Sequence, residues 1–265
     1  MHPIDESQPV IFVGGAPRSG TTVTHHLICT SEDTNPYHSE ISFILPFIQS
    51  YWTGMDNWDN HTKTFFAEPE HFRLHSRHHV ELALAHVSKV FDDPKILTVK
   101  DPAMTPYFSE INALLHGRVK FVTTVRHPYN VVRSLQAVNE KSGLVFGVDE
   151  VKQSAEVYMS TYHHIDHPGL KDVLFVLRYE DILQESVLDA LRAFTGLSDI
   201  DPDRLGIHNP DPDAALNEND PWYSPKYHAK IDIRNRLSPL DPEFRAIVNE
   251  MCRPMMERFD YHDET

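Results

Sequence analysis

A loop able to bind a phosphate group stands near the start of the chain. The segment Pro17–Thr22 reads Pro-Arg-Ser-Gly-Thr-Thr and follows an apolar run at residues 10–13. A buried strand, a glycine-bearing loop and a helix N-terminus together point backbone N–H groups at a single anion. Six residues are expected to contact it: Pro17, Arg18, Ser19, Gly20, Thr21 and Thr22.

The basic residue of this loop is not where a triphosphate-binding loop carries one. Gly15 and Gly20 have the spacing of a P-loop, which continues with Lys and then Ser or Thr. Here Thr21 and Thr22 follow, and Arg18 lies inside the loop. The missing lysine would escort the β- and γ-phosphates of a triphosphate. The pattern therefore disfavours a kinase, although a phosphotransferase using ATP and magnesium stays open as the alternative.

Pro-Arg-Ser-Gly-Thr-Thr resembles the 5′-phosphosulfate loop of the sulfotransferases that use 3′-phosphoadenosine-5′-phosphosulfate (PAPS). The arginine form is similar to the tyrosylprotein and carbohydrate branches of that family. The resemblance implies metal-independent transfer of a sulfuryl group from PAPS to a hydroxyl or amine. It also implies that Arg18 contacts the phosphosulfate. A peptide, a glycan, a lipid and a small metabolite all remain open as the acceptor.

A second phosphate-binding segment follows the apolar run 120–125. Arg126 ends that run, Pro128 begins a helical pattern, and Ser134 comes eight residues after the arginine. The segment resembles the part of these sulfotransferases that binds the 3′-phosphate, which assigns that role to Arg126 and Ser134. The alternative is an arginine paired with a carboxylate and a serine bonded to its own helix.

The run 96–100 ends in Lys100, followed by Asp101 and Pro102. It resembles the Lys-Asp-Pro of tyrosylprotein sulfotransferases, whose lysine contacts the transferring sulfuryl group. That resemblance makes Lys100 and Arg18 the residues that offset charge during transfer. Cytosolic sulfotransferases follow this lysine with Thr-His, and that histidine is their base. The histidine is missing here, so another residue must take the proton.

Glu40 is the candidate base. Its segment, 38–46, can be laid beside the Gly-Glu-Glu-Thr segment of the tyrosylprotein enzymes, which places Glu40 on their catalytic glutamate. A carboxylate in a partly dry crevice can have its pKa raised toward the working pH. The alternative is that Glu40 only begins a helix, where an acidic residue suits the helix dipole.

Two further nucleotide contacts follow from the resemblance. Residues 178–180 resemble an Arg-Tyr-Glu segment in which the tyrosine lies near the nucleotide, so Tyr179 is a candidate. Family members close the 3′-phosphate end with a basic C-terminal loop. Four residues could supply it: Lys226, Lys230, Arg234 and Arg236. Lys230 is preferred, although these cations could instead pair with the many carboxylates nearby.

Alternating strand and helix patterns must position these side chains. Strands are predicted at 10–13, 96–100, 120–125 and 173–177. Helices are predicted at 21–29, 71–91, 104–115, 129–138, 150–166, 186–195 and 242–259. This order indicates an α/β fold, with a mostly parallel sheet flanked by helices, resembling P-loop NTPases, as a single domain over residues 1–265. Residues 51–70 and 139–149 are expected to be loops that could cover a substrate.

The composition argues against several classes of binding partner and cofactor. A net charge of −15 argues against a broad nucleic-acid or anionic-membrane surface. Two cysteines and the lack of a membrane-length run or a signal region favour a cytoplasmic enzyme without disulfides. Although the chain has 18 histidines, no zinc motif accompanies them, so no metal site is expected. A catalytically silent nucleotide-binding protein remains a second alternative.

Overall fold

The computed structural model describes residues 7–205 and 239–262. Its centre is a four-stranded parallel sheet in the order β2-β1-β3-β4. The strands are β1 (Val10–Gly15), β2 (Leu97–Lys100), β3 (Val119–Val125) and β4 (Leu174–Arg178). All four predicted strands are therefore present, with bounds shifted by at most two residues. The predicted α/β fold with a parallel sheet is confirmed.

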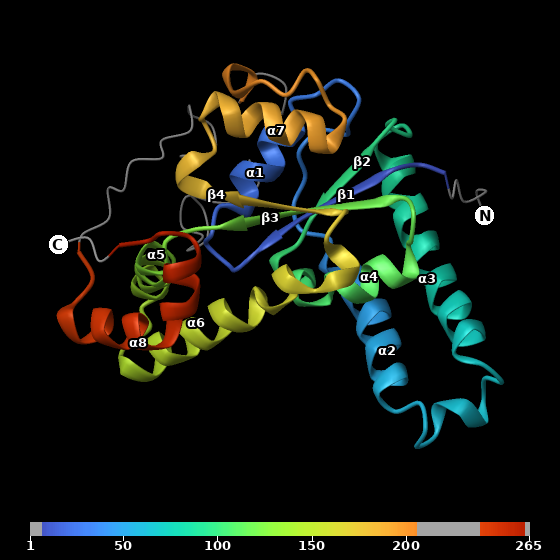
Figure 1. The fold of residues 1–265 in the computed structure, drawn as a ribbon, viewed down its shortest axis with the longest axis horizontal. Coiled ribbons are helices and arrows are strands. Elements are labelled where there is room, and N and C mark those ends of the chain that lie inside the picture. Colours follow the sequence, from blue (N-terminus) through green and yellow to red (C-terminus); the bar gives the residue numbers. More distant parts are fainter. Residues whose placement is uncertain (1–6, 206–238, 263–265) are drawn as a thin grey trace.

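Helices cover both faces of this sheet (Figure 1). They are α1 (Thr21–Ile28), α2 (Leu45–Asp56), α3 (Pro69–Val90), α4 (Phe108–Leu114), α5 (Pro128–Lys141), α6 (Val148–Thr161), α7 (Glu185–Thr195) and α8 (Pro242–Arg258). In Figure 1, α1 and α7 lie on one face and α2, α3 and α4 on the other, while α5, α6 and α8 gather at one end.

Successive side chains of β1 point to opposite faces of the sheet and therefore pack into separate cores. Val10 and Phe12 pack with α2, α3 and α4 in one buried cluster. Ile11 and Val13 pack with α1 and α7 in another. A third cluster joins α5, α6 and α8 around Val125, at the carboxyl end of β3. Burial on both faces explains why β1 reads as a continuous apolar run.

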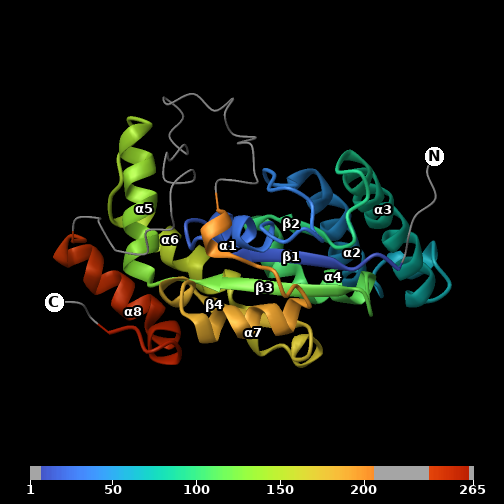
Figure 2. The same ribbon diagram turned by 90° about the horizontal axis from the view of Figure 1, so that it is seen from above.

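Neighbouring parallel strands end at the same edge of the sheet, seen from above in Figure 2. Strand β1 lies between β2 and β3. The chain passes from β1 to β2 on one side and afterwards forms β3 on the other side of β1. The point where the order reverses in this way is where open α/β sheets bind ligands. The loop after β1 and the residue after β3, Arg126, therefore meet at this edge.

Four predicted segments differ from the structure. The expected helix 150–166 is α6, which ends at Thr161, followed by a 3₁₀ helix, His163–Asp166. The expected loop 51–70 is partly helical, because α2 continues to Asp56 and α3 begins at Pro69. The expected helix 104–115 is divided into a 3₁₀ helix, Pro102–Tyr107, and α4. Pro106 explains that division, since proline has no N–H to donate within an α-helix. The expected loop 139–149 shortens to a few residues between α5 and α6.

Across residues 7–205 and 239–262, none of the helices combines the length and the apolar character that crossing a bilayer requires.

Candidate functional site

The loop after β1 is held by hydroxyl groups from two distant elements. The Gly15 N–H donates to Thr105 Oγ1 over 2.8 Å. The next amide, of Ala16, donates to the phenol oxygen of Tyr162 over 3.0 Å. The Tyr162 hydroxyl in turn donates to the carbonyl of Thr124 in β3 over 2.8 Å. These bonds fix the loop before any ligand binds, which is what a preformed anion site requires.

Gly20 sits between this loop and the ring of Tyr179. Its φ of 102° lies in the left-handed region. A Cβ atom at Gly20 would lie 2.3 Å from the Tyr179 ring, so a larger residue cannot fit there without displacing the tyrosine. The glycine thus serves a close approach as well as a turn. Tyr179, a nucleotide contact in the sequence prediction, packs directly against the loop.

Fewer backbone N–H groups of this loop are available to an anion than the sequence alone indicates. The Ser19 N–H donates to the carbonyl of Ala16 over 3.0 Å, inside the loop, and the Ser19 side chain is fully buried. By contrast, α1 begins at Thr21 with no side-chain cap. Helix geometry leaves its first N–H groups without an intrahelical acceptor. The amides at Gly20, Thr21 and Thr22 therefore remain for an anion.

Arg126 is a largely buried cation at the carboxyl end of β3. Its Nη1 donates to the carbonyl of Arg18 over 3.3 Å, and its guanidinium lies 4.6 Å from the centre of the Tyr179 ring. Its buried Nε has no hydrogen-bond partner. Burial lowers the pKa of its guanidinium more than the nearby Tyr179 and Glu180 raise it, and none of the ion pairs among the described residues includes Arg126. Leaving a buried charge in this state is energetically costly, and an anionic ligand would relieve that cost.

Ser134 lies on α5 and faces the same region. The Nε of Arg18 donates to Ser134 Oγ over 2.9 Å. Arg18 also has a positive φ of 69°, an unusual conformation for a residue with a Cβ. The structure thus brings Arg18 together with Arg126 and Ser134, which lie more than a hundred residues later in the sequence.

Lys100 and Glu40 meet on the other side of the loop. The Nζ of Lys100 donates to Thr22 Oγ1 over 3.1 Å and lies 3.5 Å from Glu40 Oε1. The Lys100 side chain is almost fully buried, whereas that of Glu40 is 47% exposed. The Lys100 carbonyl also accepts from the Ile41 amide over 3.4 Å. The predicted base and the predicted cation are therefore adjacent, beside the first turn of α1.

Asp101 holds the segment that carries Glu40. Its Oδ2 accepts from the Ser42 hydroxyl over 2.7 Å, and its Oδ1 accepts from the Ala103 amide over 2.8 Å. The second bond caps the 3₁₀ helix that follows β2. Asp101 thus joins the segment that carries Glu40 to the start of this 3₁₀ helix.

Two buried histidines behind Lys100 were not singled out by the sequence. The Nε2 atoms of His25 and His38 lie 3.1 and 3.0 Å from the carbonyl of Thr98. Burial lowers the pKa of both imidazoles. Neutral imidazoles beside Lys100 add no further positive charge. In sequence they are two of 18 histidines, and no local pattern distinguishes them.

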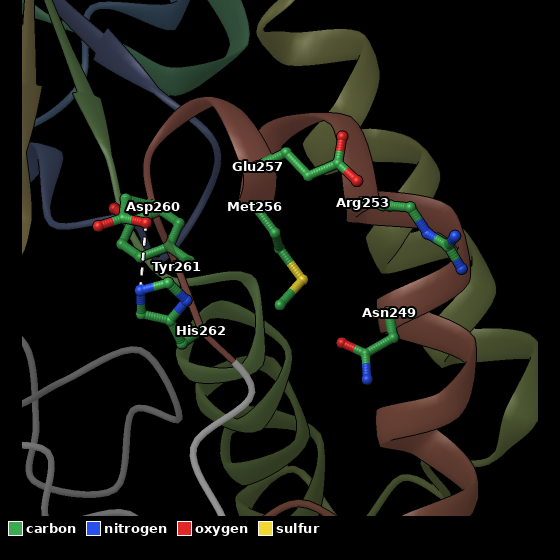
Figure 3. Close-up of a pocket in the computed structure, with 7 residues that line it drawn as sticks. All are labelled: Asn249, Arg253, Met256, Glu257, Asp260, Tyr261 and His262. Carbon is green, nitrogen blue, oxygen red and sulfur yellow. Dashed lines mark ion pairs between the residues drawn. The ribbon is translucent and has the colours of Figure 1, made fainter.

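A separate hollow of about 580 Å³ lies beside α8 (Figure 3). It is lined by Asn249, Arg253, Met256, Glu257, Asp260, Tyr261 and His262. His262 Nε2 and Asp260 Oδ1 form an ion pair over 3.1 Å. None of the predicted site residues lines this hollow. It touches the site only indirectly, because the Tyr261 hydroxyl donates to Glu180, which also accepts from the His127 amide.

Lys230 and its alternatives, Lys226, Arg234 and Arg236, lie outside the described residues. Within the described ranges, no three histidine, cysteine or acidic side chains are grouped so as to hold a metal ion. The remaining predicted residues form two adjacent groups, one around Arg126 and one around Lys100.

Comparison with known proteins identifies a family and a fold. The model of the sulfotransferase family matches residues 9–201. The sulfotransferase domain from the curacin biosynthetic pathway has a similar fold, with a TM-score of 0.56 and 17% identity over 97% of this chain and 99% of that one. The sulfotransferase domain of the Synechococcus PCC 7002 olefin synthase is similar too, with a TM-score of 0.54 and 17% identity over 97% and 96%. A search of curated proteins found no match.

Proposed function

The chain belongs to the sulfotransferase family, and from that premise we propose that it transfers the sulfuryl group of PAPS to a hydroxyl-bearing acceptor. Sulfotransferase activity follows from the family. The donor, the acceptor and the roles of individual residues make up the proposal.

The observation that carries the choice of donor is the environment of Arg126. This buried guanidinium has a free Nε, no ion-paired carboxylate among the described residues, and Ser134 and Arg18 close by. In the proposal, the loop after β1 binds one anionic group of the donor, and this second cluster binds another. PAPS carries a 3′-phosphate in addition to its 5′-phosphosulfate, whereas ATP has no 3′-phosphate. A guanidinium and a hydroxyl together suit a phosphate.

The loop supplies the contacts to the 5′ end. The amides at Gly20, Thr21 and Thr22 lie at the N-terminus of α1, where the partial positive charge of the helix favours an anion. The buried Tyr179 ring packs against both Gly20 and Arg126, and in the proposal it fixes the spacing between the two phosphate positions.

Transfer needs a proton acceptor and cations near the reacting sulfur. When bound, PAPS supplies a sulfuryl group on a phosphate that can leave. In the proposal, Glu40 takes the hydroxyl proton as the acceptor oxygen forms its bond to sulfur and the bond from sulfur to phosphate oxygen breaks. Lys100 and Arg18 offset the charge that develops on the sulfuryl and phosphate oxygens. Thr22 orients Lys100 through the 3.1 Å hydrogen bond.

Calorimetry with adenosine 3′,5′-bisphosphate, ADP and ATP, each without and with magnesium, tests the donor class. We expect the bisphosphate to bind more tightly than ADP or ATP and independently of magnesium. Arg126→Ala should weaken it at least tenfold, because a hydrogen-bonded charge contributes about 1.5–3 kcal/mol. Arg133→Ala is the matched control, since Arg133 lies on the same segment but pairs with Glu140. Magnesium-dependent preference for ATP would overturn the proposal.

A further inference from the structure

The segment directly after Glu40 has no charge. Residues 41–55 include no acidic residue, lysine, arginine or histidine, in a chain whose charged fraction is 24%. The segment forms a 3₁₀ helix, Ser42–Ile44, that continues into α2, which leads away from the sheet in Figure 1. Surface helices of globular proteins normally carry charge on their outer side. An outer side without charge suits an apolar ligand.

One side of this helix begins at the proposed active site. Three residues per turn place Ser42 in line with Leu45 in the 3₁₀ helix. Spacings of four and three then continue the line along α2 through Gln49 to Trp52. The Ser42 hydroxyl donates to Asp101, the residue after Lys100, over 2.7 Å. This contact orients the line toward the edge that carries Lys100.

A second element borders this line. The 3₁₀ helix Pro102–Tyr107 starts next to Asp101 and ends at Tyr107, beside α2. Gln49 Nε2 donates to the Tyr107 hydroxyl over 3.2 Å. The rings of Trp52 and Tyr107 meet edge to face with centroids 6.3 Å apart, and Trp52 is still 47% exposed. Two elements thus run from the Ser42–Asp101 contact to the pair formed by the exposed Trp52 and the half-buried Tyr107.

We propose that this acceptor face, made of Ser42, Leu45, Gln49, Trp52 and Tyr107, binds the apolar body of the acceptor, which is therefore an amphiphilic alcohol with an uncharged alkyl or aryl body. The proposal rests on the proposed function, because it assigns the hydroxyl end to Glu40. The face spans roughly 15 Å, from ten residues at 1.5 Å each. An ionised body would find no counter-charge along residues 41–55.

The opposite side of the same helix provides a control. Phe43 and Phe47 lie four residues apart, and the Phe47 ring stacks on His79 of α3 with centroids 5.9 Å apart. Phe43 is 56% exposed, more than Trp52. A general effect of removing an exposed aromatic residue should appear equally in both variants. An effect of the acceptor face should appear in only one of them.

The test measures binding of 1-butanol, 1-hexanol and 1-octanol to the protein saturated with adenosine 3′,5′-bisphosphate, by ligand-detected nuclear magnetic resonance. We expect about twofold tighter binding per added methylene, roughly half the effect of full burial. Trp52→Ala should weaken 1-octanol about tenfold, and Phe43→Ala should leave it unchanged. Should Trp52→Ala fail to fold, Gln49→Glu places a carboxylate on the face and should weaken 1-octanol similarly.

Affinity that does not depend on chain length, or equal losses in the two aromatic variants, would overturn the inference. So would a dimer in sedimentation that Trp52→Ala dissociates, because the face would then bind a second copy of the chain. Calorimetry of the bisphosphate separates this failure from failure of the proposed function. If the bisphosphate binds and the alkanols show no trend, only the acceptor class is wrong.

Discussion

Arg18 donates from Nε to Ser134 Oγ over 2.9 Å, and this bond joins the loop after β1 to helix α5. The Arg18 carbonyl accepts from Arg126 over 3.3 Å, so two arginines and a serine are linked in a small network. The two predicted phosphate sites are thus neighbours rather than separate features. A donor with phosphate groups at both its 3′ and 5′ positions could bridge them.

Removing the Ser134 hydroxyl should affect only ligands with a 3′-phosphate. We expect Ser134→Ala to weaken adenosine 3′,5′-bisphosphate about tenfold, since a hydrogen bond to a charged group contributes about 1.5–3 kcal/mol. AMP, which has no 3′-phosphate, should bind unchanged. Calorimetry with both ligands makes the comparison. Ser142→Ala is the control, because the Ser142 hydroxyl on the same helix segment bonds only back to Val138. Equal losses for AMP and the bisphosphate would contradict the assignment.

Gly20 is predicted to tolerate no side chain. Gly20→Ala places a Cβ 2.3 Å from the Tyr179 ring at a φ of 102°, so the ring or the loop must move. We expect at least a tenfold loss of bisphosphate affinity. Gly143 is a matched control, because its φ of 70° is also positive but nothing lies within 4 Å of its Cβ position. Gly143→Ala should cost about 1 kcal/mol of stability and leave binding intact. Similar binding losses in the two variants would show that the contact with Tyr179 is unimportant.

Glu40 should be needed for transfer but not for donor binding. Replacing it with Gln keeps the size of the side chain and removes the proton acceptor, so turnover should fall by about 10²–10⁴. Adenosine 3′,5′-bisphosphate should bind as it does to the native protein. Glu32→Gln serves as the control, since Glu32 is an exposed carboxylate paired with Arg204. Comparable turnover in Glu40→Gln would refute Glu40 as the base.

Asp101 is predicted to act by positioning Glu40. Asp101→Ala removes the bond from Ser42 and the cap on Ala103, and the lost cap alone should cost about 1 kcal/mol of stability. Turnover should fall while bisphosphate affinity stays within twofold. Asp201→Ala offers a matched cap removal, because Asp201 caps a 3₁₀ helix elsewhere through the Asp203 amide. A turnover loss of the same size in both variants would indicate a general stability effect.

Most of the strands and helices were predictable, because each produces a pattern in its own stretch of sequence. Burial on both faces makes the strands continuous apolar runs, and strand ends followed by Arg18, Lys100 and Arg126 identify one edge of a parallel sheet. Helix α2 was not predicted, and its last residues were expected to lie in a loop, for a physical reason. It exposes Phe47 on one side and Trp52 on the other, so no single apolar stripe stands out.

Contacts between distant segments were not predictable. Nothing near Asp101 in the sequence indicates that its carboxylate binds Ser42, 59 residues away. The approach of Gly20 to Tyr179 likewise depends on how β4 lies next to β3. The sequence identifies residue types at the sheet edge, whereas packing decides which atoms are engaged and which remain available.

His164 illustrates a buried titratable group outside the proposed site. Its Nδ1–H donates to the Thr161 carbonyl over 2.8 Å, and its Nε2 accepts from Thr123 over 3.0 Å. Both contacts are satisfied by the neutral ring. Burial lowers the pKa of this imidazole from 6.5 to about 4. Below pH 6.5 the unfolded chain therefore binds a proton that the folded protein does not.

Stability should consequently fall as the pH drops from about 6.5 to about 4, and His164 should contribute up to roughly 3 kcal/mol of that loss. Above pH 6.5 its contribution is constant. Urea denaturation at pH 7, 6 and 5 of the native protein and His164→Gln measures the effect. The variant should lose stability less steeply with acid, while His163→Gln, at the exposed neighbouring position, should follow the native protein. Parallel pH dependences in the native protein and His164→Gln would show that another group dominates, the buried His25 and His38 being the next to test.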